Sequence, residues 1–361
     1  MNQQVGVCKD KIDTPALCLD ADALERNIDR MAAFFGKRPA ALRPHSKTHK
    51  CPSIAWMQLR AGAIGVTCAK LDEAEAMARA GIRDILIANQ IIGPKIPRLM
   101  GLATYSDVMV AVDDIANAAD LSAAACAAGV TLRVLLEVEV GMGRCGVPAG
   151  EPSLALARRV ASLPGLRFEG IMGYEGHAVM IPDAEERRAA AEKAMGILTG
   201  AADLLRRDGL PVGIVSGGGT GTYDVTGAYP GVTEVQAGSY ATMDARYHSV
   251  GIDFERALTV VARVISTPRD DLAIIDAGLK TMTTEFGLPV LVRPEGWALE
   301  RLSEEHGMLR REGGNPLRPG DVVEFVPSHG CTTINLHDAY VVTCEDRVVA
   351  EWPIAARGGV R

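Results

Sequence analysis

Residues 132–146 read LRVLLEVEVGMGRCG, an apolar run with several valines that ends in a glycine-rich segment. The run lacks the strict alternation of apolar and polar residues seen in a half-exposed strand, which is typical of a parallel strand buried on both faces. Runs of this kind recur between residues 40 and 240. The predicted strands are residues 40–43, 64–68, 85–88, 107–112, 132–137, 168–173, 213–216 and 233–236.

Helical stretches separate these runs, at residues 70–80, 115–128, 152–163 and 183–207. Gly81 and Gly129 follow the first two stretches and suit helix C-caps, because glycine adopts the left-handed conformation at little cost. Eight strands with helices between them favour a (β/α)8 TIM barrel, which we assign to residues 21–250. An open doubly wound sheet is the alternative, because a strand count from one sequence can err by one or two.

The pattern of the sequence changes after Gly251. Alternating or β-branched runs occupy residues 257–267, 272–278, 289–294, 321–328 and 339–354, separated by Pro, Gly and Asp. Residues 297–306 are the one stretch of this region that suggests a helix. We predict an antiparallel β-domain made of residues 251–361 together with residues 1–20, whose run at 16–20 would supply a strand.

Composition limits the classes of function. Apolar residues make up 48% of the 361 residues and charged residues 23%, as in folded soluble proteins. The net charge of −7 argues against nucleic-acid binding, which needs a basic surface. No run approaches the roughly 18 apolar residues of a membrane span, residues 1–11 lack the core of a signal peptide, and the eight cysteines form no CxxC pair. We predict a cytoplasmic protein without nucleic-acid or membrane partners.

Chemically unusual residues follow five of the eight predicted strands. Barrel active sites form at the carboxyl ends of the strands, so these segments share one rim. They are RPHSKTHK at 43–50, GMGRCG at 141–146, YEGH at 174–177, SGGGTG at 216–221 and QAGSY at 236–240.

The segment SGGGTG suits a phosphate site. Three consecutive glycines let the backbone approach a ligand, and their amides can face an anion. Ser216 and Thr220 add hydroxyl donors, and Gly238 with Ser239 would complete the site from the next strand. A plain tight turn is the alternative, and no nucleoside triphosphate loop is present.

Lys47 lies between His45 and His49 directly beyond a buried strand, where desolvation would favour its neutral, nucleophilic amine. A lone lysine is more often a solvated charge. A lysine and a phosphate site on one rim are the minimal set for pyridoxal phosphate, and this combination favours the cofactor hypothesis.

His329 and Cys331 lie two residues apart in PSHGCTT, so an extended backbone would place both side chains on one face. Imidazole and thiolate together suit zinc or a similar metal, and a two-ligand site leaves positions open for substrate. From the spacing alone, a buried cysteine beside a hydrogen-bonded histidine is the favoured alternative.

The chain resembles the D-threonine aldolase and eukaryotic-type D-serine dehydratase family, which comprises alanine racemase-like pyridoxal phosphate enzymes of fold type III. The similarity extends from residue 13 to the C-terminus. It is carried, in order, by RPHSKTHK, GMGRCGV, SGGGTGTYD, VQAGSYATMD, IIDAGLKTMTTE, PSHGCTTINLHD and IAARG.

The resemblance implies a barrel that binds pyridoxal 5′-phosphate, a C-terminal β-domain and a homodimer. It assigns Lys47 to covalent attachment of the cofactor, Arg144 to its phenolate oxygen and His329 with Cys331 to a divalent metal (zinc, manganese or magnesium). Gln236 stands where alanine racemase has an arginine against the pyridine nitrogen. The further predicted cofactor contacts are Tyr174, Ser216, Gly218, Gly219, Thr220, Gly238, Ser239 and Tyr240.

The resemblance also bears on the reaction. The motifs are mostly closer to the aldolases, which predicts a lyase that cleaves a D-3-hydroxy-amino acid to glycine and an aldehyde, with His177 in the role of a catalytic histidine. Cys331 departs from this pattern, because the aldolases typically carry Asp there and the zinc-dependent dehydratases carry Cys. A D-serine or D-3-hydroxyaspartate dehydratase is therefore the alternative. An amino-acid racemase and a non-catalytic pyridoxal phosphate-binding protein are less favoured.

Overall fold

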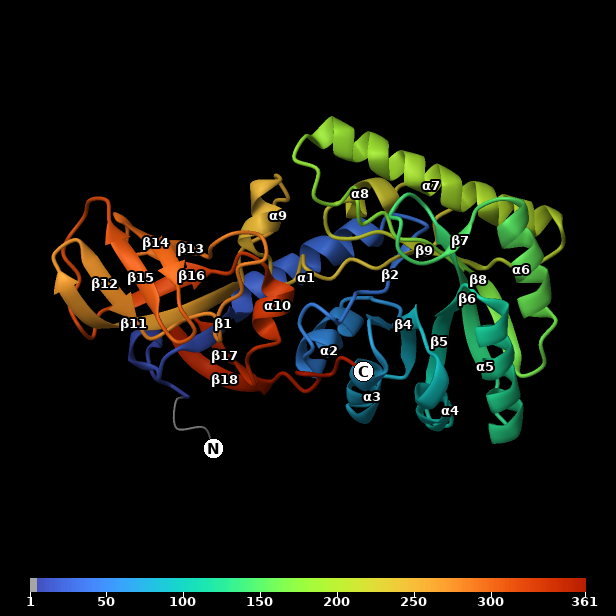
Figure 1. Ribbon diagram of the computed structural model, residues 1–361, viewed down its shortest axis with the longest axis horizontal. Coiled ribbons are helices and arrows are strands. Elements are labelled where there is room, and N and C mark those ends of the chain that lie inside the picture. Colours follow the sequence, from blue (N-terminus) through green and yellow to red (C-terminus); the bar gives the residue numbers. More distant parts are fainter. Residues whose placement is uncertain (1–4) are drawn as a thin grey trace. The chain divides into compact units, whose positions relative to one another are not determined.

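The structure is a computed structural model that describes residues 5–361. It divides into two units, shown in Figure 1. The barrel unit comprises Arg30–Lys47, Ile54–Gly238 and Gly359–Arg361, and the sheet unit comprises the described part of Met1–Asp29 with Thr48–Ser53 and Ser239–Gly358. The domain boundaries at residues 20/21 and 250/251 stay a prediction; this division places its main boundaries at residues 29/30 and 238/239.

Parallel strands form the centre of the barrel unit. Within residues 5–361 they are eight, β2 (Ala41–Leu42), β3 (Val66–Cys68), β4 (Asp84–Gln90), β5 (Asp107–Val112), β6 (Leu132–Glu139), β8 (Leu166–Met172), β9 (Ile214–Gly217) and β10 (Glu234–Val235). Hydrogen-bonded neighbours follow the order β2-β10-β9-β8-β6-β5-β4-β3, and a bridge between His45 and Thr67 joins the two ends. The closed ring confirms the barrel prediction and excludes the open sheet.

Helices pack along the outside of these strands, and α5, α6 and α7 are seen there in Figure 1. Helix α5 begins after Asp114, whose carboxylate accepts from the amides of Ala116 and Asn117, and it ends at Gly129 with φ +65°. The helices are α2 (Pro52–Arg60), α3 (Leu71–Arg79), η2 (Gly93–Lys95), α4 (Ile96–Ala103), α5 (Ile115–Ala128), α6 (Glu151–Ala161), α7 (Ala184–Arg207) and α8 (Tyr223–Thr226). Helix α1 (Ala21–Phe35) begins in the sheet unit and ends in the barrel unit, and the short strand β7 (Val147–Pro148) pairs with β6.

Buried ion pairs occupy the amino end of the barrel. The Arg43 side chain is 2% exposed, and its guanidinium donates to both carboxylate oxygens of Glu234, at 3.1 and 2.9 Å, and to Asp84 at 2.6 Å. Asp84 and Glu234 are the first residues of β4 and β10. Such an arrangement is costly to disrupt, because removal of one partner leaves a buried charge unpaired.

The sheet unit is built from mostly antiparallel strands. They are β1 (Ala16–Asp20), β11 (Leu258–Arg269), β12 (Leu272–Ile275), β13 (Val290–Arg293), β14 (Trp297–Leu302), β15 (Gly307–Arg311), β16 (Val322–Val326), β17 (Ala339–Cys344) and β18 (Arg347–Pro353). Strand β1 pairs antiparallel with β11 and parallel with β17, which confirms that the N-terminal run joins this sheet. Short helices are η1 (Lys9–Lys11), α9 (Ala245–Ser249) and α10 (Gly330–Ile334).

The helical interpretation of residues 297–306 was wrong. Strand β14 occupies Trp297–Leu302 and pairs antiparallel with β15. Trp297 and Leu299 are buried while Ala298 between them is only partly buried, which is the two-residue period of a strand. In the part of the chain that the structure describes, no helix is long and apolar enough to span a bilayer.

Candidate active site

The carboxyl rim of the barrel brings together predicted residues from three loops. Lys47 follows β2, Arg144 follows β6 and Tyr174 follows β8. Lys47 Nζ lies 5.8 Å from the centroid of the Tyr174 ring, and Arg144 Cζ lies 5.7 Å from the same centroid. These distances are within the range of cation–π attraction. The ring of Tyr174 is thus close to both cations.

Carboxylates hold the loop that carries Arg144 at both of its ends. Glu139 accepts from the amides of Gly141 and Gly143, each at 2.8 Å, and Asp113 accepts from the amide of Gly146 at 3.0 Å. The backbone hydrogen bonds to Glu139 lower the pKa of its carboxyl. The loop is therefore tied to β6 and to the end of β5 on either side of the arginine.

His177 lies against the start of this loop. A Cβ built on Gly141, where φ is +117°, would come within 2.9 Å of Cε1 of the His177 imidazole. The glycine therefore leaves the space that the imidazole fills. The predicted catalytic histidine and the arginine loop are neighbours on one rim.

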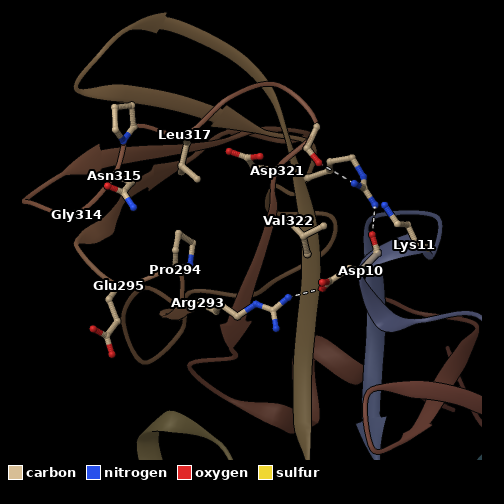
Figure 2. A pocket seen from close by; sticks show the side chains of 13 residues that line it. Asp10, Lys11, Arg293, Pro294, Glu295, Gly314, Asn315, Leu317, Asp321 and Val322 are labelled. Atoms are coloured by element: carbon tan, nitrogen blue, oxygen red, sulfur yellow. Dashed lines mark hydrogen bonds and ion pairs between the residues drawn. The ribbon is translucent and has the colours of Figure 1, made fainter.

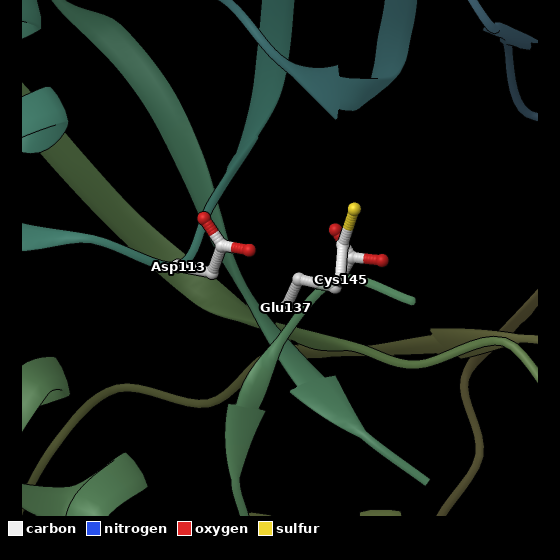
Figure 3. A group of neighbouring side chains, drawn as sticks. All are labelled: Asp113, Glu137 and Cys145. Carbon is white, nitrogen blue, oxygen red and sulfur yellow. The ribbon is translucent and has the colours of Figure 1, made fainter. Parts of the chain in front are cut away.

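A group of possible metal ligands also lies beside Arg144. Figure 3 shows Asp113, Glu137 and Cys145, whose ligand atoms are within 4.8 Å of one another. Burial raises the pKa of the Glu137 carboxyl, and the hydrogen bond from Gln90, at 2.6 Å, and the charge of Arg144 oppose that rise. Gln90 and the Gly146 amide each donate to one of the two carboxylates, and the cluster remains a second candidate for a metal site.

The glycine loop after β9 directs two of its amides into the protein. Gly218, with φ +81°, donates its N–H to the carboxylate of Glu175 at 3.0 Å, and Gly219 donates to Thr222 Oγ1 at 3.3 Å. These two amides were predicted to face an anion, and the structure gives both of them protein acceptors. The predicted contacts of Gly218 and Gly219 with the cofactor stay a prediction. Such contacts would depend on the close approach of the backbone, because both amide N–H groups already have protein acceptors.

The rest of this loop suits an anion. Gly221 is buried, and its amide has no acceptor among residues 5–361. Ser216 and Thr220 are also buried, and Ser216 Oγ accepts a 3.0 Å hydrogen bond from Gln236 Nε2. A Cβ on Gly219 would lie 3.3 Å from Tyr174 Cε2, which places Tyr174 against the loop. A buried amide without an acceptor beside a lysine, an arginine and an aromatic ring fits a phosphorylated aromatic cofactor.

The predicted metal pair lies in the sheet unit. His329 Nδ1 is 2.8 Å from Oδ2 of Asp244, which is 1% exposed and also accepts from the Gly330 amide at 3.0 Å. A carboxylate on one ring nitrogen orients the imidazole and leaves Nε2 for a metal. Burial alone would lower the pKa of His329, but the Cys331 thiolate and Asp244 outweigh it and raise that pKa to about 11. Imidazole and thiolate thus interact directly, and this pair of donor groups suits a divalent metal.

Two predicted cofactor residues belong to the sheet unit. Ser239 Oγ lies 3.8 Å from Cys331 Sγ and 3.5 Å from Thr48 Oγ1. The Tyr240 ring is fully buried, and its centroid is 5.6 Å from that of Phe254. Gly238 is the last barrel-unit residue before Ser239. The structure therefore groups Ser239 with Cys331 and places Tyr240 in the core of its own unit.

A pocket of about 620 Å³ also lies in the sheet unit, shown in Figure 2. Arg293 pairs with the carboxylate of Asp10, and Arg263 donates to the carbonyls of Gly320, at 2.8 Å, and of Asp10, at 3.1 Å. The lining contains none of the predicted site residues. Its arginines already have acceptors, so the pocket is a poor candidate for the cofactor.

Comparison with known proteins identifies the family. Residues 19–246 match the family described as "Alanine racemase, N-terminal domain", and residues 257–343 match "Putative serine dehydratase domain". A D-threonine aldolase of Arthrobacter sp. is 42% identical over 354 residues, which cover 96% of this chain and 93% of that protein. The chain belongs to the D-threonine aldolase and D-serine dehydratase family.

Other members of this family are similar over nearly their whole length. The 3-hydroxy-D-aspartate aldolase of Paracoccus denitrificans (strain Pd 1222) is 39% identical, with 98% of this chain and 94% of the relative covered. The crystal structure of D-threonine aldolase from Filomicrobium marinum superposes with a TM-score of 0.97 at 40% identity, covering 100% of each chain. The D-threo-3-hydroxyaspartate dehydratase of Delftia sp. (strain HT23) is 33% identical over 94% of this chain and 97% of its own.

Three buried carboxylates of this family member were not singled out from its sequence. Glu175 contacts the glycine loop, Glu137 lies near Arg144, and Asp244 orients His329. Asp244 had a local signal, because it is the N-cap of α9 and accepts from the Tyr247 amide. The other two have partners that local sequence patterns do not reveal.

Proposed function

We propose that this chain is a pyridoxal 5′-phosphate- and divalent-metal-dependent lyase that cleaves D-3-hydroxy-amino acids to glycine and an aldehyde. The observation that carries the proposal is the approach of Lys47 and Arg144 to the Tyr174 ring beside the glycine loop. The similarity to relatives named as D-threonine and 3-hydroxy-D-aspartate aldolases supports the reaction type.

The barrel unit supplies the residues that would hold the cofactor. Lys47 has no carboxylate partner within residues 5–361, so its amine is available for attachment. Arg144 would donate to the phenolate oxygen, and Tyr174 would contact the ring. Gln236 is neutral, so it can form a hydrogen bond but cannot supply the charge of an arginine. When bound, the cofactor withdraws electrons from the α-carbon of an attached amino acid.

The sheet unit supplies the residues that would hold the metal. His329 Nε2 and Cys331 Sγ are the proposed ligands, with Asp244 behind the imidazole. A divalent ion at this pair lowers the pKa of a coordinated hydroxyl. His177 is the proposed base that accepts the hydroxyl proton at an imidazole nitrogen, and the absence of a side chain on Gly141 leaves room for its ring. We further propose zinc as the metal, a cytoplasmic location and a homodimer, as the family resemblance suggests.

A dehydratase is the second candidate, and Cys331 is the observation that favours it. The thiol stands where aldolases of the family typically carry a carboxylate. The Delftia relative named as a D-threo-3-hydroxyaspartate dehydratase adds support. In that reaction Lys47 would take the α-proton, and the products would be a keto acid and ammonia.

The deciding experiment compares products from a matched set of substrates. The enzyme with cofactor and a divalent metal is given D-threonine, D-allo-threonine, D-serine and the D-3-hydroxyaspartates, and glycine and ammonia are measured together. We expect glycine and aldehyde from the D-3-hydroxy acids and no product from the L-isomers. Ammonia and keto acid as the main products would contradict the aldolase proposal.

A further inference from the structure

Glu175 is a fully buried carboxylate in the loop after β8. Its exposed fraction is 0%, and it accepts three hydrogen bonds. The donors are the Gly218 amide at 3.0 Å, Thr222 Oγ1 at 2.7 Å and Thr226 Oγ1 at 2.5 Å. All three donors belong to one segment, the glycine loop after β9 and the short helix α8 that follows. Glu175 therefore links two neighbouring loops of the barrel rim.

The links form a directional chain. Gly219 donates its N–H to Thr222 Oγ1, and the hydroxyl of Thr222 in turn donates to Glu175. Because Thr222 Oγ1 is the donor in this hydrogen bond, the hydroxyl proton of Thr222 points toward Glu175. The oxygen of Thr222 is then free to accept from Gly219. One carboxylate thus sets the directions of the Gly218 and Gly219 amides.

All three donors to Glu175 are uncharged, and within the described residues the carboxylate has no ion-pair partner. Burial of an ionised carboxylate is costly unless strong hydrogen bonds compensate for the lost water. A glutamine at position 175 has the same shape and could keep one acceptor oxygen. Its NH₂ group would replace the other oxygen and would face a hydrogen-bond donor.

The turn of the loop has a consequence for the Gly221 amide. The Gly218 amide donates to Glu175 and the Gly219 amide donates to Thr222, whereas the Gly221 amide is not a donor to Glu175. The Gly221 amide lacks an acceptor in residues 5–361, as described above. The Glu175 carboxylate thus binds the Gly218 amide and Thr222, and the buried Gly221 amide is left available for the phosphate.

We propose that Glu175 is a positioning residue that shapes the glycine loop for the phosphate group of the cofactor. This inference rests on the proposed function, because it assumes that the loop holds that phosphate. It adds a residue that touches neither cofactor nor substrate but acts through Gly218, Gly219 and Thr222.

The test compares two ligands that differ only by the phosphate. Affinities of the cofactor-free enzyme for pyridoxal 5′-phosphate and for pyridoxal are measured for the wild type and for Glu175→Gln. We expect Glu175→Gln to weaken pyridoxal 5′-phosphate binding by about tenfold or more and to change pyridoxal binding by less than about twofold. Equal losses for both ligands, or no loss, would overturn the proposal, because a merely structural role would not single out the phosphate.

Two further variants make the experiment decisive. Thr222→Val removes the hydroxyl between Gly219 and Glu175, so it should show the same selective loss even if Glu175→Gln does not fold. Glu73→Gln is the matched control, because Glu73 is also buried and accepts from an amide, that of Ala69, in the loop after β3. A selective loss in Glu73→Gln would overturn the proposal. A wild type that prefers pyridoxal would instead contradict the cofactor site itself.

Discussion

Both ends of the barrel contain basic side chains, but among the described residues these are in ion pairs at the amino end and outside ion pairs at the carboxyl end. At the amino end, Arg43 donates to Glu234 and Asp84, and Arg133 pairs with Asp107 at 3.0 Å and Glu169 at 3.2 Å. At the carboxyl end, Lys47 makes no ion pair with any residue from 5 to 361, Arg144 acts on Glu137 by its charge without an ion pair, and both cations lie near the Tyr174 ring. Cations paired with acids stabilise a fold, whereas cations without such partners are available to a ligand.

The raised pKa of Arg43 also shows that this cation is stabilised by acidic partners. Burial alone would lower the pKa of its guanidinium, but Glu234 and Asp84 outweigh burial and raise it. The charge is thus permanently compensated within the protein. We therefore expect substitutions at the amino end to change stability and substitutions at the carboxyl end to change function.

The largest effect is expected at the carboxyl end. Lys47→Ala should reduce turnover by at least about 1,000-fold, because it removes the amine that we propose attaches the cofactor. Borohydride reduction of the wild-type holoenzyme should label Lys47, as read by peptide mass spectrometry. The unfolding midpoint of the cofactor-free protein should be unchanged. Lys70→Ala is the control, and label on Lys50 or Lys70 would refute the assignment.

The converse result is expected at the amino end. Arg43→Ala should lower the free energy of unfolding by about 3–5 kcal/mol, because it leaves Glu234 buried without its partner. Turnover per folded molecule should stay near that of the wild type. Denaturant titration and active-site titration provide the two measurements. Arg158→Ala, which removes an exposed pair with Asp208, should leave stability nearly unchanged.

The sheet unit allows a third comparison, between Asp244, which orients an imidazole, and His329, the proposed metal ligand. Asp244→Asn should weaken metal affinity by about 10- to 100-fold, because it alters the acceptor that orients His329. Competition with a chelator measures this affinity, and the affinity for pyridoxal 5′-phosphate should not change. Asp276→Asn is a matched control, since this carboxylate accepts from the Arg263 amide in the same unit. Equal losses in both variants would contradict a specific role for Asp244.

The smallest effect is expected at the cluster beside Arg144. Cys145→Ser should change bound metal and turnover by less than about twofold, because the Asp113 and Glu137 carboxylates already have hydrogen-bond donors. Metal content by elemental analysis, compared with that of His329→Ala, distinguishes the two groups. Loss of metal only from Cys145→Ser would mean that the metal binds to the barrel unit.

The strands were predictable because their signal is local. β5 occupies the predicted residues 107–112, and α5 occupies the predicted residues 115–128, which are bounded by the Asp114 cap and by Gly129. Strands that are buried on both faces need apolar residues at consecutive positions, and a sequence displays that directly. The error at 297–306 arose where a short alternating strand was interpreted as a helix.

The carboxylates that accept hydrogen bonds at the site were not predictable, because their partners are distant in the sequence. Three glycines in a row indicate that a backbone can turn, but they do not indicate where its amides point. The partner of Gly218 lies 43 positions away at Glu175, and that of His329 lies 85 positions away at Asp244. Only the folded chain brings these groups together. For this reason the cation and aromatic residues were named from the sequence, and the carboxylates were not.

The closed ring has a consequence for the order in which the protein can become active. The strand that precedes Lys47 pairs with β10, and Arg43 and Glu234 are separated by 191 positions. Because synthesis proceeds from the N-terminus, the lysine leaves the ribosome long before its neighbouring strand exists. A nascent chain that stops short of β10 has the lysine but not the neighbours of its strand. Attachment of the proposed cofactor to Lys47 should therefore occur only after the whole barrel has been synthesised.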